Sequence, residues 1–181
     1  MKLSEDDGKR FYDLWLPLLD YVNEKRGVNS RLRDIHLADY LDPNEVKEVS
    51  DVLWANVDLI DEYLTDVKDI SDQDRELIAS WKRCVSGRFI LERILKKGAM
   101  LISVEDEEVY QVSGIVSTWD EMFGYARLPL MIQATLIPFE DVIISDGLVQ
   151  MYKVIIGGNM ARAFKDTYMA AKKSGMIHRQ L

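Results

Sequence analysis

The fold of this chain is decided by residues 128–158, which read LPLMIQATLIPFEDVIISDGLVQMYKVIIGG. This is its longest concentrated run of β-branched and apolar residues, the types that favour strands. Three candidate strands can be separated in it, at 130–137, 141–145 and 148–156. Pro138 divides the first strand from the second. The pair Asp146-Gly147 predicts a tight hairpin turn before the third, because such turns need residues that tolerate positive φ.

The N-terminal half of the chain predicts amphipathic helices. Residues 4–26 carry apolar side chains at helical spacing, and Gly27 supplies a stop. Pro17 is expected to kink this helix or to split it into two pieces. Further helices are expected at 31–41, from Pro43 to about Thr65 with Asp42 as N-cap, and at 72–86 with Ser71 as N-cap. His36 falls on or near an apolar face, where a lone histidine is usually a hydrogen-bonded packing residue.

The hydrophobic period changes at Gly87, which predicts a meander of strands at 88–95, 99–104 and 108–116. Thr118 and Glu121 form a capping box at the start of a short helix that ends at Gly124. Asn159 is the expected N-cap of a last helix over 159–174, which Gly175 ends. We expect the remaining tail to be frayed.

These elements predict an α+β fold. We expect a helical unit of three or four helices over 1–86 and a mostly antiparallel sheet of five or six strands in 87–181. The helical unit packs on the sheet in this prediction, and the helix 159–174 closes over it. The helical stripes are too apolar to face solvent, so the two halves could share one core.

The motifs Ile137-Pro138-Phe139, Ile143-Ile144, Asp146-Gly147 and Gly157-Gly158 together form a signature, (L/I)PF…II.DG…GG. In this signature the chain resembles a family of uncharacterised bacterial proteins, over about residues 88–173. Ser145 stands where that family has tyrosine, and the Cys/His zinc tail of some longer members is absent. Because the signature consists of turn and packing residues, the resemblance implies a shared fold and carries no activity with it.

The formal net charge is −8, and its distribution is uneven. Residues 1–86 carry 12 Lys/Arg against 20 Asp/Glu, whereas residues 87–181 carry 11 of each. An acidic chain repels phosphate backbones, so nucleic-acid binding is not expected. The only basic face on offer lies in the last helix and tail, through Arg162, Lys165, Lys172, Lys173 and Arg179. The acidic half is either a solvated surface or a docking surface for a basic partner.

Composition indicates a soluble, cytoplasmic protein. The chain opens with MKLSEDDGKR, which lacks the apolar segment of a signal peptide. Its longest uncharged run, from Leu128 to Phe139, is too short for a membrane helix, so no membrane partner is expected. The single cysteine, Cys84, cannot form an internal disulfide, which fits a reducing compartment.

The sequence contains no recognisable catalytic or metal-binding motif. Two distant histidines and one cysteine do not make a metal site, and the GxGxxG and P-loop fingerprints are absent, so we expect no metal or cofactor. Our first hypothesis is a non-enzymatic protein–protein interaction module. The alternative is a small enzyme or small-ligand-binding protein, and whether the chain is an enzyme stays open. The expected ligand-binding residues for this alternative are Asp146, Gly147, Tyr152, Gly157, Gly158 and Asn159. Sheet edges also suggest a homodimer.

Overall fold

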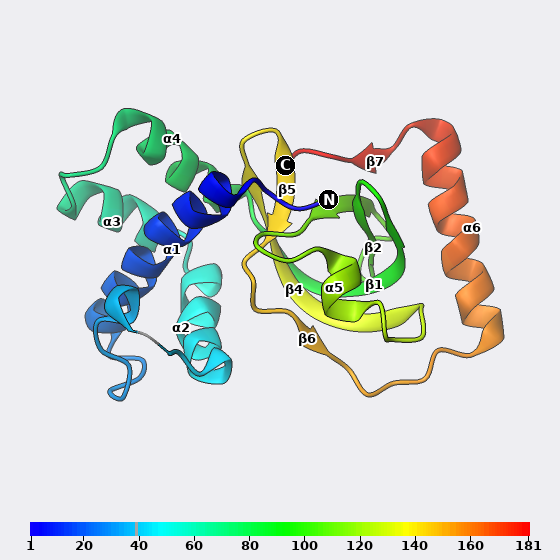
Figure 1. The fold of residues 1–181 in the computed structure, drawn as a ribbon, viewed down its shortest axis with the longest axis horizontal. Helices are drawn as coiled ribbons and strands as arrows, with labels where there is room; N and C mark the ends of the chain where they lie inside the picture. The colour runs from blue at the N-terminus through cyan, green and yellow to red at the C-terminus, as the bar shows by residue number, and fades with distance from the viewer. Residues whose placement is uncertain (39) are drawn as a thin grey trace. The chain divides into compact units, whose positions relative to one another are not determined.

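The computed structural model describes residues 1–38 and 40–181 (Figure 1). It confirms the α+β fold: helices come first, a mixed and mostly antiparallel seven-stranded sheet follows, and a helix lies near the C-terminus. The chain divides into two compact units, a helical unit of residues 5–83 and a barrel unit of residues 1–4 and 84–181. Within the described residues, no helix combines the length and apolar character needed to cross a bilayer.

The helical unit contains α1 (Glu5–Arg26), α2 (Pro43–Ala55), α3 (Leu59–Asp66), α4 (Asp72–Ser80) and the 3₁₀ turns η1 (Ile35–Leu37) and η2 (Trp81–Arg83). The prediction for α1 is confirmed, including its stop at Gly27, whose φ is 59°. Asp42 and Ser71 cap α2 and α4 as predicted, since their side chains accept the N–H groups of Asn44 and Asp74.

Three helical predictions were wrong. The expected helix 31–41 is only the short turn η1, because the Asp20 carboxylate accepts the N–H groups of Ile35 and His36. The long helix ends at Ala55, where the Asn56 side chain donates to the carbonyl of Val52 and a new helix follows. The helix 72–86 ends at Ser80. Because α1 runs through Pro17 as a single helix, the alternative of a split at Pro17 does not hold, and the kink stays a prediction.

The core of the helical unit is aromatic. Trp15 stacks on Trp54 with ring centroids 5.2 Å apart, and Trp81 meets Trp15 edge-on. Phe11 completes the cluster against both Trp15 and Trp81. Aromatic pairs in these geometries contribute stability beyond the area that they bury, so this cluster fixes how the helices pack.

The barrel unit is built from β1 (Val85–Leu95), β2 (Gly98–Ser103), β3 (Val109–Ser113), β4 (Leu130–Phe139) and β5 (Val142–Ser145). The pairings run β1–β2–β3–β5–β4, and β4 pairs back to β1, so the sheet closes into a barrel. Only the β3–β5 pairing within this ring is parallel. Folds of this kind take many ligands, so the topology alone defines no function.

The barrel is filled by the inward side chains of its strands. Leu91, Leu101 and Leu136 are fully buried there, and α5 (Trp119–Phe123), which links β3 to β4, adds Trp119 and Phe123 to the same cluster. The predicted capping box of α5 is confirmed at Thr118 and Glu121. A register shift between Leu91 and Arg93 bends β1, which lets it pair with both β2 and β4.

The predicted hairpin at Asp146-Gly147 was wrong. Both β5 and β6 (Gln150–Met151) run antiparallel to β4 along one edge, so the chain does not reverse between them. Between the pairs Ser145–Leu136 and Gln150–Gln133, the edge strand advances five residues against three in β4. Gly147, with φ of 85°, lies in this bulge. The expected third strand over 148–156 is therefore reduced to two residues.

The last elements are α6 (Gly158–Ser174) and β7 (Ile177–His178), and Figure 1 shows α6 running beside β1 and β2. Gly157 is the N-cap of α6, in place of the predicted Asn159, and Gly175 ends the helix as expected. The tail is not frayed: β7 pairs with β3, and His178 stacks on Tyr110 and contacts the Glu108 carboxylate at 2.7 Å.

Candidate functional site

A cavity lies in the helical unit, beside the C-terminal half of α1. It has a volume of about 530 Å³ and lies between α1 and the loop that follows Gly27. Leu32 and Gly27 line part of it, and the rest of the lining is polar: Asp20, Asn23, Glu24, Asn29, Ser30, Arg33, Asp34 and His36. A cavity of this size with a few convergent polar groups is the usual form of a binding site.

Asn23 holds this loop in place. Its amide nitrogen donates to the carbonyls of Asn29 and Leu32 at 3.0 and 2.9 Å, and its oxygen accepts the Asn29 N–H at 2.8 Å. Asn23 is 8% exposed, so these bonds are sheltered from water. Because one buried side chain satisfies three backbone groups, it substitutes for the helix that the sequence predicts at this position.

Asp20 fixes the other side of the cavity. Its carboxylate accepts the N–H groups of Ile35 and His36 and also contacts Nδ1 of the His36 ring. The prediction that His36 is a hydrogen-bonded residue is confirmed. The ring is 42% exposed, however, and so it does not pack in a core.

Two further carboxylates at the cavity have no ion-pair partner within the described residues, those of Glu24 and Asp34. Asp34 precedes η1 with φ of 51° and makes no capping bond through its side chain. Arg33 also lines the cavity, so three carboxylates, those of Asp20, Glu24 and Asp34, face one permanently charged side chain of opposite sign. Leu37 and Tyr40 follow the lining residue His36 in sequence, and these two large side chains are 71% and 82% exposed.

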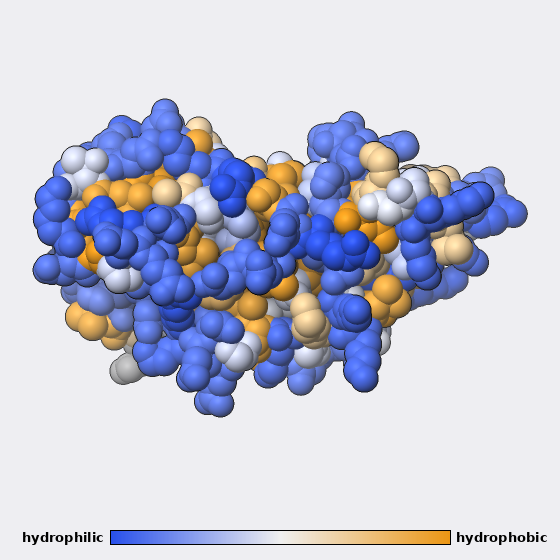
Figure 2. Space-filling model, turned by 90° about the horizontal axis from the view of Figure 1, so that it is seen from above, coloured by the Kyte–Doolittle hydropathy of each residue, from blue (hydrophilic) through white to orange (hydrophobic). Residues whose placement is uncertain are grey.

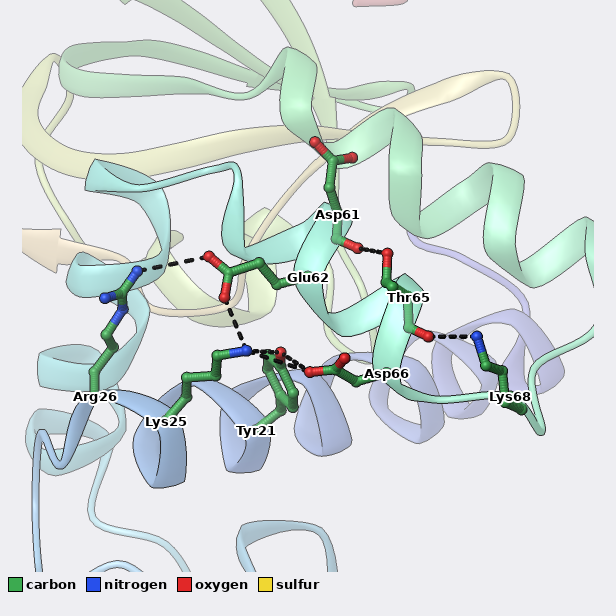
Figure 3. A network of polar contacts seen from close by, with 8 residues as sticks. All are labelled: Tyr21, Lys25, Arg26, Asp61, Glu62, Thr65, Asp66 and Lys68. Carbon is green, nitrogen blue, oxygen red and sulfur yellow. Dashed lines mark hydrogen bonds and ion pairs between the residues drawn. The ribbon is translucent and has the colours of Figure 1, made fainter.

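Other acidic residues of this unit form ion pairs between helices (Figure 3). Lys25 of α1 lies 2.9 Å from Glu62 and 3.2 Å from Asp66 of α3, and Tyr21 donates to Asp66 at 2.7 Å. Hydrogen bonds from Tyr21 and Lys25 lower the pKa of Asp66. The pKa of Lys25 is raised by its own hydrogen bonds to Tyr21, Glu62 and Asp66. Glu24 and Asp34 at the cavity take no part in this network.

A second cavity, of about 320 Å³, lies in the barrel unit between the β1–β2 turn and the start of α5. It is lined by Met1, Ile94, Leu95, Lys96, Gly98, Thr118, Trp119 and Asp120. The N-terminal ammonium of Met1 donates to the Lys96 carbonyl at 2.9 Å, which anchors the start of the chain here. The indole N–H of Trp119 is buried and has no hydrogen-bond partner within the described chain.

The ligand-binding residues expected from the sequence do not line either cavity. Asp146 is 3% exposed, and its carboxylate accepts the N–H of Leu148 at 3.1 Å across Gly147. Tyr152 donates to Gln133 at 2.8 Å beside the edge strand. Gly157 and Gly158 form the start of α6, where the Asn159 oxygen accepts a bond from Arg162. A site that uses all of these residues stays a prediction.

The reactive residue types are also dispersed. Burial raises the pKa of the Cys84 thiol, which disfavours the thiolate that nucleophilic chemistry needs. His36 and His178 are each engaged with a carboxylate in different units. No group of three metal-ligating side chains exists among residues 1–38 and 40–181.

No protein-family model, curated protein or solved structure matches this chain. The site is therefore defined by its own geometry. Sequence reasoning missed Asn23 because it is a polar residue on the otherwise apolar, buried face of α1, and Glu24 because it lies on the exposed face of that helix. The one available signal was the pair Gly27 and Asn29 that follows α1, since such residues mark a structured loop.

Proposed function

We propose that the protein is a non-enzymatic protein–protein interaction module whose helical unit binds a basic segment of a partner protein. The observation that carries this proposal is the acidic cavity at α1, where Glu24 and Asp34 form no ion pair with any cation of residues 1–38 and 40–181. A Lys or Arg side chain that entered the cavity would supply the missing charge, and carboxylates accept the donors of either group.

Two further features support a protein partner. The helical unit carries 11 Lys/Arg against 20 Asp/Glu, so its field attracts basic segments. The exposed Leu37 and Tyr40 lie in the loop that continues from the cavity lining. Aromatic and aliphatic anchors beside a charged pocket are typical of protein interfaces, where tyrosine is enriched.

The experiment is a titration of the full-length protein with a labelled peptide that alternates arginine and leucine, followed by fluorescence anisotropy. Its twin carries glutamine in place of arginine. We expect binding of the arginine peptide alone, weakened by salt and by the double variant Glu24→Gln, Asp34→Asn. The matched control, Glu5→Gln with Asp69→Asn, removes the same charge from the same unit at exposed positions. Equal binding of both peptides, or equal weakening by both double variants, would overturn the proposal.

A small-ligand-binding protein is the second candidate. The cavity beside Asp120 favours it, because it is concave and carries both Asp120 and Lys96. In this alternative the Asp146-Gly147 bulge and the Gly157–Gly158 helix start remain the proposed subsite. Native mass spectrometry of untagged protein from its own cells tests it: a retained small-molecule mass supports the ligand binder, and a retained polypeptide that high salt releases supports the interaction module.

The same proposal places the protein in the cytoplasm. Its single cysteine, Cys84, is half-buried and cannot form an internal disulfide, as expected in a reducing compartment. A homodimer through the remaining strand edges is part of the proposal as well, and size-exclusion chromatography with light scattering tests it.

A further inference from the structure

The C-terminal segment carries an unusual concentration of unpaired cations. Residues 153–181 contain six Lys/Arg against one acidic residue, Asp166. The six cations are Lys153, Arg162, Lys165, Lys172, Lys173 and Arg179, and none forms an ion pair with a described carboxylate. Cations elsewhere commonly do: Lys25, Lys82 and Arg88, for example, are paired with Glu62, Asp61 and Glu105.

On α6 these cations form one stripe. Arg162, Lys165, Met169, Lys172 and Lys173 are spaced by three, four, three and one residues, so they share a face of the helix. The opposite face carries Phe164, Tyr168 and Ala171, which pack against outward side chains of the barrel. At the right-hand end of Figure 2, where Figure 1 places α6, blue hydrophilic residues lie among paler, moderately apolar ones.

The helix is held firmly in this orientation. Tyr168 is 2% exposed and lies against Ile90, Met100 and Ile102 of β1 and β2, and the Arg93 guanidinium sits 4.1 Å from its ring centroid. The surface beneath α6 is formed by β1 and β2, with Val109 of β3 in the same cluster. Because that face is covered, the outer stripe of α6 is the surface that this side of the barrel presents.

Apolar side chains are also exposed just before α6 and in its first turn. The segment between β6 and α6 exposes Val154 and Ile155, the latter 96% exposed, and Met160 in the first turn of α6 is half exposed. Water around an isoleucine that is almost wholly exposed has a free-energy cost, which burial in an apolar phase removes. The stripe itself carries Met169, also half exposed.

We propose that this surface binds an anionic lipid membrane at its interface, through the cationic stripe of α6 and insertion of Val154 and Ile155. A bilayer supplies both chemistries at once, with anionic headgroups at the surface and hydrocarbon just beneath it. Single-stranded nucleic acid would use aromatic platforms for its bases, and the stripe carries none. Salt screening limits the range of electrostatic interactions to about 8 Å at physiological ionic strength. The negative net charge of the whole chain therefore does not cancel the attraction of a local cationic stripe.

The test is flotation of the full-length protein with vesicles of phosphatidylcholine alone or with about 30% phosphatidylserine, near the anionic fraction of a cytoplasmic leaflet. We expect binding to the anionic vesicles only, lost in about 0.5 M salt. The variants Lys165→Glu with Lys172→Glu, and Ile155→Asp alone, should each weaken binding at least tenfold. The matched control is Lys96→Glu with Lys97→Glu, which makes the same charge change at the exposed β1–β2 turn and should leave binding within about twofold.

Three results would overturn the proposal. The first is no binding to anionic vesicles by a protein whose circular dichroism shows a folded chain. The second is equal weakening by the Lys165/Lys172 and Lys96/Lys97 reversals. The third is tighter binding to a single-stranded oligonucleotide than to vesicles, unaffected by Ile155→Asp, which would assign the stripe to nucleic acid.

Discussion

At the scale of single residues, Asn23 has the clearest structural role. Its side chain satisfies two carbonyls and one N–H of the loop that lines the larger cavity, and it is buried. We predict that Asn23→Ala lowers the free energy of unfolding by about 2–4 kcal/mol, since buried backbone groups lose their partners. Urea denaturation measures the loss. Hydrogen exchange should become faster at residues 27–36 before global unfolding.

Asn56→Ala is the matched control for this prediction. The Asn56 amide also donates to a carbonyl, that of Val52, but the side chain is exposed and water can replace it. We expect a loss below about 0.5 kcal/mol. If both variants lost the same stability, burial of the Asn23 bonds would not be the cause.

Trp119 gives a second prediction at this scale. It is 1% exposed in the barrel interior, and its indole N–H has no described partner. An unsatisfied buried donor costs about 1–3 kcal/mol. Trp119→Phe removes that donor, which offsets the loss of ring volume, so we expect a net change within about 1 kcal/mol. Trp119→Ala should cost about 3–5 kcal/mol. Thermal unfolding of both variants would test this, and a loss above about 2 kcal/mol in Trp119→Phe would show that the N–H has a partner.

Local signals predicted single residues well where one side chain acts on its own neighbours. The caps at Asp42, Ser71 and Thr118 and the stops at Gly27 and Gly175 are all confirmed. Asn23 and Asp20 were not foreseen because their partners lie several residues away in a loop. Nothing in a local pattern indicates which carbonyls such a side chain will meet.

At the scale of elements, the strand pair β5 and β6 along one edge of β4 shows why the strand topology could not be predicted from the sequence. The composition of residues 128–158 correctly predicted strands, yet the turn at Asp146-Gly147 became a bulge. A positive φ at Gly147 suits either outcome. The choice depends on β4, whose free edge is long enough to pair with β5 and β6 in succession. The true reversal is at Glu140, which adopts φ of 48° without being glycine.

Pro138 was read as the end of a strand, but β4 continues to Phe139. The β1 ladder ends at Leu136, so within the described strands one edge of β4 has no partner near Pro138. Proline is tolerated where a strand needs no donor on that edge. Closure of the barrel, and with it the second edge of β4, could not be deduced from local spacing.

The start of α6 provides a prediction for an element. Gly157 is its N-cap, with φ of −70° and ψ of 158°, and makes no side-chain capping bond. A Cβ added there would meet nothing within 4 Å. We predict that Gly157→Asp stabilises α6 by about 0.5–1 kcal/mol, because it adds a cap and removes the freedom of glycine in the unfolded chain. Hydrogen exchange of α6 amides measures this.

Gly157→Ala is the matched control for this change. It also restricts the unfolded chain but cannot cap, and alanine is a poor N-cap. Slower exchange in Gly157→Asp alone is the expected result. Equal effects of both substitutions would attribute the gain to backbone entropy and not to the cap.

At the scale of the whole molecule, the net charge conceals that acidic and basic residues are segregated along the chain. The net charge of −8 led to the expectation that the protein does not bind nucleic acid. The deficit lies in the helical unit, whereas residues 153–181 carry an excess of cations on one exposed helix face. The sequence itself shows which residues are basic. Whether they were paired depended on packing, because only the fold brings carboxylates such as Glu62 to Lys25.

The final prediction concerns the pH dependence of stability. Hydrogen bonds from Ser71 and Arg10 lower the pKa of Asp74 below its ordinary value of 3.8, and bonds from Thr118 lower that of Glu121 below 4.5. A carboxyl whose folded-state pKa is lowered stabilises the fold above its unfolded pKa, and this contribution is lost as pH falls through the folded value. Stability should therefore be nearly constant above about pH 5 and fall below about pH 4.

Asp74→Asn tests this expectation in the helical unit. At pH 7 we expect a loss of about 1–2 kcal/mol, because the Asp74 carboxylate accepts Ser71 Oγ at 2.6 Å and Arg10 Nε at 2.8 Å and is only partly exposed. As pH falls and Asp74 itself becomes protonated, the difference between variant and parent should shrink toward zero. Urea denaturation at several pH values measures it, with Asp69→Asn, an exposed carboxylate of the same unit, as the control. A difference that stayed constant from pH 7 to about pH 3 would mean that the lost contact is not a charge-assisted bond, since only an ionised Asp74 can make one.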